Sequence, residues 1–281
     1  MHYLNGLAEI APAYDGFILD LWGVIHNGIT AYPDALDCLR KLAGRPTLLL
    51  SNAPRRAGSV QRTLQRMGVP DALYTHILTS GEATWHALHT RSDPWFAALG
   101  KRIYHLGPER DRSVMAGLGT TLAATPQAAD ILLNTGPDDS RESAPLDAFI
   151  PELLACLQAN LPMICANPDL EIVRGTERIL CAGSLAVWYE TEGGNVRWIG
   201  KPDPAIYATA LATLGLPAKR VLAIGDSLRT DIIGANAAGI DSVWVLGGIH
   251  GDEVGGDPAR AEAAAAATRA TPLAVIERLA W

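Results

Sequence analysis

The chain has 281 residues, 48% of them hydrophobic, and a net charge of −7, a composition typical of a globular protein with one large or two modest domains. The acidic balance argues against a nucleic-acid or anionic-membrane partner, whose binding surfaces are basic. The N-terminus lacks secretory features and no run of about 20 apolar residues spans a membrane. We therefore expect a cytoplasmic protein with four buried, reduced cysteines.

The first predicted elements are a strand at residues 17–19, a helix at 33–43 and a strand at 48–50. Both strand runs are apolar throughout, which is typical of strands buried in a parallel sheet. The helix begins at Pro33, a residue suited to a first turn, and should stop at Gly44. Its length is that of the single helix that joins two parallel strands.

Residues 81–182 are predicted to form an inserted domain, because far more residues separate Ser51 from Lys201 than one strand–helix unit needs. The segment contains a predicted helix at 146–160 and four strand-like runs, at residues 102–106, 130–134, 163–166 and 178–181. A second domain placed over the edge of a sheet would act as a lid. The core domain is then discontinuous and comprises residues 1–80 and 183–281.

Strands and helices alternate again after the insertion. A helix should start at the N-cap Asp203 and end at Gly215. Further along, we predict strands at 221–224 and 243–246, a helix at 230–238, a surface helix or mobile loop at 255–270, and a short helix at 272–281. The pattern predicts an α/β fold, with a doubly wound, mostly parallel sheet and an inserted α/β cap, in which ligands bind beyond the carboxyl ends of the strands.

Aspartates follow two of the predicted core strands. Asp20 closes the first strand, and Asp226 and Asp231 follow the strand at 221–224. A carboxylate at a buried strand end is costly without a cation, and Mg²⁺ prefers carboxylate ligands. We interpret Asp20 as a nucleophile that also binds Mg²⁺ and Asp226 as a direct metal ligand. Asp231 would bind through water or orient the site, or would simply pair with the helix dipole.

Ser51, Asn52 and Lys201 offer groups that suit a phosphoryl group. The Ser51 hydroxyl and the backbone N–H groups that follow it match the equatorial oxygens. Lys201, fixed between Gly200 and Pro202, could bridge the nucleophile and the phosphate as a point charge. Each feature alone is more typical of a turn or a solvated loop. Together with the aspartates they favour magnesium-assisted attack on phosphorus.

This ordered set of motifs resembles the haloacid dehalogenase-like hydrolase superfamily. The long insertion before Lys201 is similar to the class IIA branch, whose C2-type cap lies between the second and third motifs. The stretches Asn167-Pro168-Asp169 and Gly183-Ser184-Leu185 also resemble that branch, whose members include sugar and nitrophenyl phosphatases. The resemblance covers nearly the whole chain and implies a magnesium-dependent hydrolase of small phosphorylated metabolites, with dimerisation through the cap in many members.

The resemblance also implies roles for individual residues. Asp20 is the nucleophile that forms an aspartyl-phosphate, and Mg²⁺ is bound by Asp20, the backbone carbonyl of Trp22 and Asp226. Ser51 and Lys201 hold the phosphoryl group, and Asp231 supports the metal.

Trp22 departs from the family pattern, in which the second residue after the nucleophile is an aspartate that protonates the leaving oxygen and activates water. An indole can do neither, although its backbone carbonyl remains available to Mg²⁺. Because general acid–base help is worth about 10²–10⁴-fold, esters with good leaving groups should be favoured. Trp22 could line the substrate pocket or merely pack. His26 is a candidate replacement acid, with a solvent-facing loop histidine as the alternative.

Two other functions stay open from the sequence. The chain could be a phosphate-ester-binding or regulatory protein that lost turnover with the second aspartate. It could also be a hydrolase of another bond, such as carbon–halogen or carbon–phosphorus. Lys201, Asp226 and Asp231 favour a metal-bound phosphoryl group over the latter. No motif in residues 81–182 identifies the substrate.

Overall fold

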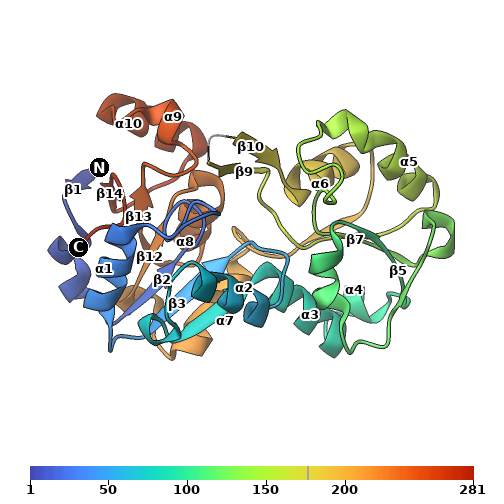
Figure 1. Ribbon diagram of the computed structural model, residues 1–281, viewed down its shortest axis with the longest axis horizontal. Helices are drawn as coiled ribbons and strands as arrows, with labels where there is room; N and C mark the ends of the chain where they lie inside the picture. Colours follow the sequence, from blue (N-terminus) through green and yellow to red (C-terminus); the bar gives the residue numbers. More distant parts are fainter. Residues whose placement is uncertain (176) are drawn as a thin grey trace.

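The computed structural model describes residues 1–175 and 177–281 and has two lobes, each built on its own parallel sheet (Figure 1). Both chain termini lie in the left-hand lobe of Figure 1. The other lobe comes from the middle of the chain. Within the described residues, none of the helices combines the length and the hydropathy needed to span a bilayer. The four cysteines are free and buried.

The core sheet consists of parallel strands in the order β1-β14-β13-β12-β2-β3-β4. Their bounds are β1 His2–Leu4, β2 Gly16–Leu19, β3 Thr47–Ser51, β4 His76–Thr79, β12 Val221–Gly225, β13 Asp241–Val245 and β14 Ala274–Ile276. The chain moves outward from β2 to β4 in one direction and from β12 to β14 in the other, so the switch point lies between β2 and β12. Ligands bind at such points, beyond the carboxyl ends of the strands. Because Ile224 pairs with Leu19, the residues that follow these two strands are neighbours.

Helices cover both faces of the core sheet, because alternate side chains of each strand point to opposite faces. Phe17 and Leu19 pack in one apolar cluster with α1 and α2, whereas Ile18 packs in another with α7 and α8. A third cluster, around Trp244, joins α9 and α10 to the sheet. The bounds of these helices are α1 Pro33–Leu42, α2 Ala57–Arg66, α7 Pro204–Leu214, α8 Ile233–Ala237, α9 Gly251–Val254 and α10 Pro258–Thr268.

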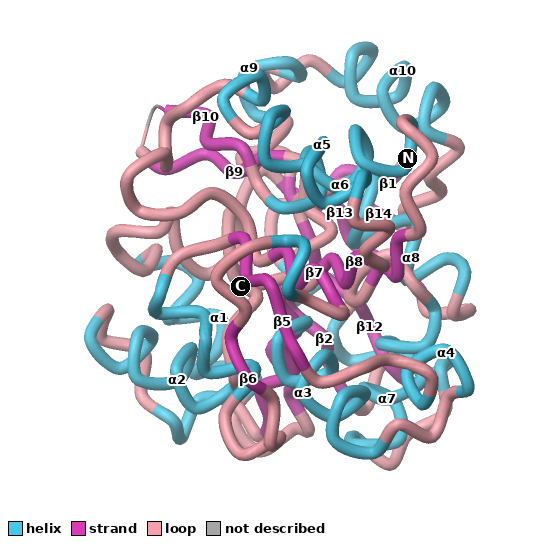
Figure 2. The backbone as a smooth tube through the Cα atoms, turned by 90° about the vertical axis from the view of Figure 1, so that its right-hand side faces the viewer, coloured by secondary structure: helices cyan, strands magenta, loops and turns pink. Residues whose placement is uncertain are grey.

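The second lobe contains a parallel sheet in the order β11-β8-β7-β5-β6. Helices α5 and α6 lie on one side of it and α3 and α4 on the other (Figure 2), and each side has its own apolar cluster. The switch point of this sheet lies between β5 and β7. The bounds are α3 Ser80–Thr90, α4 Pro94–Ala97, β5 Arg102–Leu106, β6 Thr121–Leu122, β7 Ile131–Asn134, α5 Ile150–Gln158, β8 Met163–Cys165, α6 Ala182–Thr191 and β11 Val196–Trp198.

The second lobe extends beyond the boundary predicted at residue 182. Helix α6 packs Leu185 and Tyr189 into the apolar cluster of this lobe, and β11 pairs in parallel with β8. Residues up to 198 therefore belong with the inserted sheet. Strand β11 has the sequence Val-Arg-Trp, which forms no apolar run and so gives no strand signal.

An antiparallel hairpin, β9 (Glu171–Arg174) and β10 (Glu177–Leu180), belongs to neither sheet and lies between the two lobes (Figure 1). It contacts the core on two sides. The Trp22 indole N–H donates to the Val173 carbonyl at 2.7 Å, and the Arg178 guanidinium donates to the Ile249 carbonyl at 3.3 Å. The hairpin therefore joins the inserted lobe to the core across the switch point of the core sheet.

Most predicted helices are present, but the one at 272–281 is wrong. Residues 274–276 form β14, which pairs in parallel with β1 and with β13. An apolar run this short does not distinguish a strand from a helix by its periodicity. The Asp203 cap and the Gly215 stop of α7 are confirmed: Asp203 accepts the N–H of Ala205, and Gly215 has φ +66°. The helix predicted at 230–238 begins instead with the irregular helical turn Leu228–Ile232.

Candidate active site

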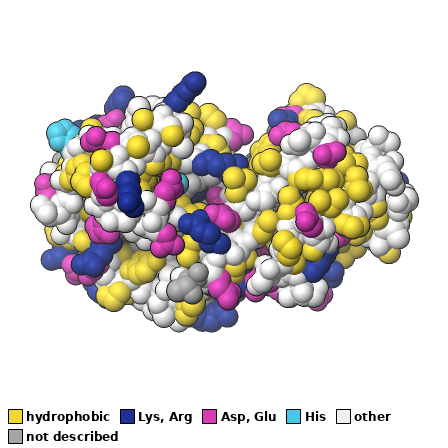
Figure 3. Space-filling view, turned by 90° about the horizontal axis from the view of Figure 1, so that it is seen from above, with side chains coloured by type: hydrophobic (Ala, Val, Ile, Leu, Met, Phe, Trp, Pro, Cys, Tyr) yellow, Lys and Arg dark blue, Asp and Glu magenta, His cyan; other side chains and the backbone are white. Residues whose placement is uncertain are grey.

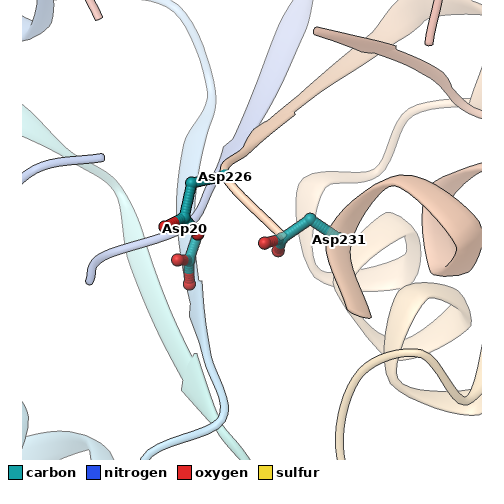
Figure 4. Close-up of side chains that lie close together, drawn as sticks. All are labelled: Asp20, Asp226 and Asp231. Carbon is teal, nitrogen blue, oxygen red and sulfur yellow. The ribbon is translucent and has the colours of Figure 1, made fainter. Parts of the chain in front are cut away.

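Three aspartates converge at the carboxyl edge of the core sheet. Asp20 directly follows β2, Asp226 directly follows β12, and Asp231 lies in the irregular turn Leu228–Ile232. Their buried carboxylates are close together in Figure 4, and one oxygen of each lies within 4.8 Å of the others. The structure thus brings together the three aspartates that the sequence marks as candidates.

Lys201 places its ammonium group between two of these carboxylates. Its Nζ donates to Asp20 Oδ1 at 2.6 Å and to Asp231 Oδ1 at 2.7 Å. Asn52 holds the lysine backbone, because its side-chain oxygen accepts the Lys201 N–H at 2.8 Å and its amide donates to the Lys201 carbonyl at 3.1 Å. Lys201 is therefore a buried counter-ion whose position depends on the loop after β3.

The site has too little positive charge for its carboxylates. Burial, and then the charges of Asp20 and Asp231, raise the pKa of Asp226 well above its usual range. Burial also raises the pKa of Asp231 to about 6, although Lys201 opposes the shift. Burial alone would lower the pKa of Lys201, but Asp20 and Asp231 raise it well above its usual value, so the ammonium stays charged. One buried cation facing three carboxylates is an arrangement that a divalent cation would balance.

Two glycines bring the backbone close to Asp226. Gly23 has φ +82°, and a Cβ at this position would lie 2.1 Å from Asp226 Oδ2. A Cβ at Gly248 would lie at the same distance, and the next residue, Ile249, donates its N–H to Asp226 Oδ2 at 2.7 Å. The peptide that joins Trp22 to Gly23 therefore runs beside Asp226. This placement fits the Trp22 carbonyl as a further oxygen ligand of a metal ion.

The oxygen donors of the site fit Mg²⁺, a hard cation that takes carboxylate and carbonyl ligands. Asp231 differs from the other two aspartates, because both of its oxygens already accept protein N–H groups. Oδ1 accepts from Lys201, and Oδ2 accepts from the Ser227 backbone at 3.1 Å. This arrangement suits the supporting role predicted for Asp231 rather than direct ligation.

Ser51 and Asn52 have different surroundings. Ser51 is the last residue of β3 and lines the same cavity as Asp20, with its Oγ accepting the Ala53 N–H at 3.1 Å. The Asn52 side chain has all four of its hydrogen bonds made by protein groups: two to Lys201, one from the Ser80 hydroxyl at 3.0 Å, and one to a cavity carboxylate at 2.8 Å. Asn52 therefore orients its neighbours, and its side chain has no hydrogen bond left to offer a phosphoryl group.

Trp22 lines the cavity and is tied to the hairpin through its indole N–H. Its ring packs on Gly28, where φ is +85° and a Cβ would lie 2.3 Å from the indole. His26 is buried beside it, edge-on to the Trp22 ring at 5.3 Å between centroids, and accepts the Gly28 N–H on Nδ1. Burial lowers the pKa of His26 to about 4, so the ring is neutral near pH 7. Neither expectation for His26, a replacement acid or a solvent-facing loop residue, fits this position.

The carboxylates face a cavity of about 960 Å³ between the core and the inserted lobe. The inserted lobe contributes Pro108, Thr135 and Asp169, which follow β5, β7 and β8. The core contributes Asp20, Trp22, Ser51, Asn52, Lys201, Asp226 and Asp231. Asp169 is the cavity carboxylate that accepts the Asn52 amide, and burial raises its pKa. Asp169 belongs to the stretch Asn167-Pro168-Asp169 that resembles the class IIA branch, and, like Asp20, it follows a predicted strand. That shared position is the signal by which it could have been found.

Comparison with known proteins agrees with this arrangement. A family model described as haloacid dehalogenase-like hydrolase matches residues 17–121, and a HAD-hydrolase-like model matches residues 198–277. The crystal structure of a haloacid dehalogenase-like hydrolase from Brucella suis 1330 has a TM-score of 0.84 and 31% identity, covering 98% of this chain and 99% of that one.

Two further matches, one in sequence and one in structure, come from Mycobacterium tuberculosis. Its D-glycerol 3-phosphate phosphatase is 29% identical over 265 residues, which make up 90% of this chain and 69% of that protein. A glycerol phosphate phosphatase from the same organism, solved in complex with calcium, has a TM-score of 0.64 and 27% identity over 89% of this chain and 72% of that one.

Proposed function

This chain belongs to the haloacid dehalogenase-like hydrolase family, and on that premise we propose that it is a magnesium-dependent phosphatase of small phosphorylated metabolites. The observation that carries the proposal is the Lys201 ammonium, which bridges Asp20 and Asp231 beside Asp226 at the floor of a cavity. Phosphatases among its relatives support the reaction type, and the calcium complex of one of them supports a divalent cation.

Asp20 is the nucleophile in the proposed reaction. Its carboxylate oxygen bonds to phosphorus while the bond from phosphorus to the ester oxygen breaks, which gives an aspartyl-phosphate and an alkoxide or phenoxide that takes a proton from water. Burial raises the pKa of Asp20, and the Lys201 ammonium opposes this shift and favours the ionised form needed for attack. Water then cleaves the aspartyl-phosphate to inorganic phosphate and restores the carboxylate.

The other residues bind and orient the phosphoryl group. The Ser51 hydroxyl and the backbone that follows it would contact its equatorial oxygens, and Lys201 would offset their charge. When bound by Asp20, Asp226 and the Trp22 carbonyl, Mg²⁺ would supply the positive charge that the carboxylates lack. Trp22 offers no proton to the leaving oxygen, so esters of acidic alcohols should react fastest.

The test is release of nitrophenol from nitrophenyl phosphate, a substrate whose leaving group needs little protonation. We expect turnover that requires Mg²⁺ and falls at least about a thousandfold in Asp20→Asn. The matched control is Asp37→Asn, an exposed aspartate of α1 remote from the cavity, which should keep the wild-type rate.

Three results would contradict the proposal. Full turnover in Asp20→Asn would remove the nucleophile, and activity unaffected by chelator would favour cleavage of another bond. Tight ester binding without turnover, in folded protein saturated with Mg²⁺, would favour a binding or regulatory protein instead.

A further inference from the structure

The cavity lies between the carboxyl edges of two parallel sheets. On the core side, Asp20 and Asp226 follow the strands β2 and β12 that flank one switch point. On the other side, Pro108 and Thr135 follow β5 and β7, which flank the switch point of the inserted sheet. Both edges are positions where such sheets bind ligands. A substrate held at phosphorus by the core would therefore extend its other end toward the inserted lobe.

Five arginines line this cavity. Arg178 pairs with Glu171 and Arg229 donates to the Pro168 carbonyl at 2.7 Å. The other three, Arg55, Arg110 and Arg174, come from separate segments. Arg55 belongs to the loop after β3, four residues beyond Ser51. Arg110 lies in the 3₁₀ helix Glu109–Met115 that follows β5, and Arg174 ends β9 of the hairpin. Seen from above, dark-blue Lys and Arg side chains, with Asp and Glu beside them, gather where the two lobes meet (Figure 3).

The structure fixes the backbone of Arg55. Its carbonyl accepts the Thr79 hydroxyl at 2.5 Å, and a Cβ on Gly81 would lie 2.4 Å from the Arg55 nitrogen. The start of α3 is therefore packed directly on this loop. Arg55 is presented to the cavity by a close backbone contact that requires glycine at position 81.

The hairpin and Trp22 place Arg174. Trp22 donates to the carbonyl of Val173, the preceding residue, and the Arg174 guanidinium lies over the Trp22 ring, 5.9 Å from its centroid. Arg174 also donates to Glu142 at 2.7 Å. The indole that stands where the family has an acid thus orients an arginine toward the substrate cavity.

Acidic neighbours satisfy only part of this cluster. Arg55 donates its Nε to Asp111 at 3.0 Å, and Arg110 contacts Asp139, whose side chain is 65% exposed. A guanidinium has five N–H donors, so among the described residues most donors of Arg55 and Arg174 have no protein acceptor. Burial, followed by the charge of Arg55, lowers the pKa of Arg110 from its usual value, while the charges of Asp111 and Glu142 oppose the shift. An anion in the cavity could accept hydrogen bonds from the guanidinium donors that these acidic side chains leave free.

We propose that Arg55, Arg110 and Arg174 bind a second anionic group of the substrate, a carboxylate or a phosphate, at the end remote from the transferred phosphoryl group. The inference rests on the proposed phosphatase function and narrows its substrates to small phosphate monoesters with two anionic ends. Forked guanidinium donors are suited to both kinds of anion.

Binding of non-hydrolysable phosphonates tests this inference without requiring turnover. Calorimetry with excess Mg²⁺ would compare phosphonopropionate with phosphonopropionamide, in which a neutral amide replaces the carboxylate. It would also compare propylenediphosphonate with propylphosphonate. In at least one pair, we expect the doubly anionic ligand to bind at least about tenfold more tightly than the singly anionic ligand. The pair with the larger ratio identifies the second anion as carboxylate or phosphate.

The variants Arg110→Gln and Arg174→Gln should each reduce the ratio of the dissociation constants of the singly and doubly anionic ligands toward one. Arg62→Gln, on the exposed side of α2, should keep the wild-type ratio. Thermal unfolding would verify that each variant is folded. Ratios near one for both pairs in wild type, or unchanged ratios in both arginine variants, would overturn the inference. Nitrophenyl phosphate hydrolysis reports separately on the phosphatase function, so failure of one does not imply failure of the other.

Discussion

Replacing Asp226 with asparagine should stabilise the protein in the absence of metal while abolishing its response to Mg²⁺. The Asp226 carboxylate is buried, and its nearest charged groups are the carboxylates of Asp20 and Asp231. Asparagine keeps the size of the side chain and the oxygen that accepts the Ile249 N–H, but it removes the charge. The site would therefore lose a repulsive group without creating a cavity.

The magnitude follows from the distances. Two unit charges 4.8 Å apart, at an effective dielectric constant of about 20, repel each other by about 3.5 kcal/mol. Asp226 has two such neighbours, but Lys201 attracts it and proton uptake limits the cost, so we expect a net gain of about 2 kcal/mol. When the pKa of a carboxyl group is higher in the folded than in the unfolded protein, the free energy of unfolding decreases as the pH rises above the unfolded pKa. The gain in the free energy of unfolding of Asp226→Asn should therefore be largest near pH 8 and vanish at about pH 4.

The assay is thermal unfolding in chelator and in saturating Mg²⁺ at both pH values. A gain of about 2 kcal/mol shifts the Tm of a chain of this size by about 4–8 °C. Wild type should be stabilised by Mg²⁺ and Asp226→Asn should not, because binding to the folded state raises stability only where the site exists. The exposed Asp37→Asn should behave like wild type. A lower Tm for Asp226→Asn in chelator at pH 8 would refute the reasoning.

Three other substitutions have expected outcomes. Lys201→Met should lower the free energy of unfolding in chelator by about 3–5 kcal/mol, measured with urea, because it strips two buried carboxylates of their counter-ion; a gain in stability would contradict that role. Trp22→Phe should speed hydrogen exchange in residues 171–175 and 177–180 about fivefold, through loss of the bond to Val173, and unchanged exchange would show that the indole does not hold the hairpin. Trp22→Asp should raise the rate ratio of alkyl to aryl phosphates at least about tenfold, and an unchanged ratio would mean that another group already supplies the proton.

The aspartates of the site could be predicted from the sequence because each follows a buried strand, and a buried strand is recognisable from its apolar residues. Asp20 and Asp226 each end an apolar run, and parallel strands buried on both faces must be apolar throughout. The carboxyl ends of parallel strands meet at one edge of the sheet, so the positions of the aspartates in the sequence predict that they lie close together. The cap at Asp203 and the end of the helix at Gly215 could also be predicted, because capping depends on adjacent residues.

The short strands could not be predicted from the sequence. β11 and β14 have three residues each, too few for a period of two to stand out, and pairing with β8 and with β13 decides their conformation. The predicted domain boundary at 182 and the predicted helix at 272–281 failed for this reason.

Other features of the site depend on contacts between distant segments, and only the tertiary structure shows them. His26 resembles a loop histidine in the sequence, but packing beside Trp22 buries it and lowers its pKa to about 4. Arg55, Arg110 and Arg174 are separated along the chain by whole elements, and only the docking of the two lobes lines one cavity with them. Local sequence determined which residues end the strands, because burial and capping act over a few residues. The surroundings of each charge depended on which distant segment packs against it, because desolvation and Coulomb forces act through space.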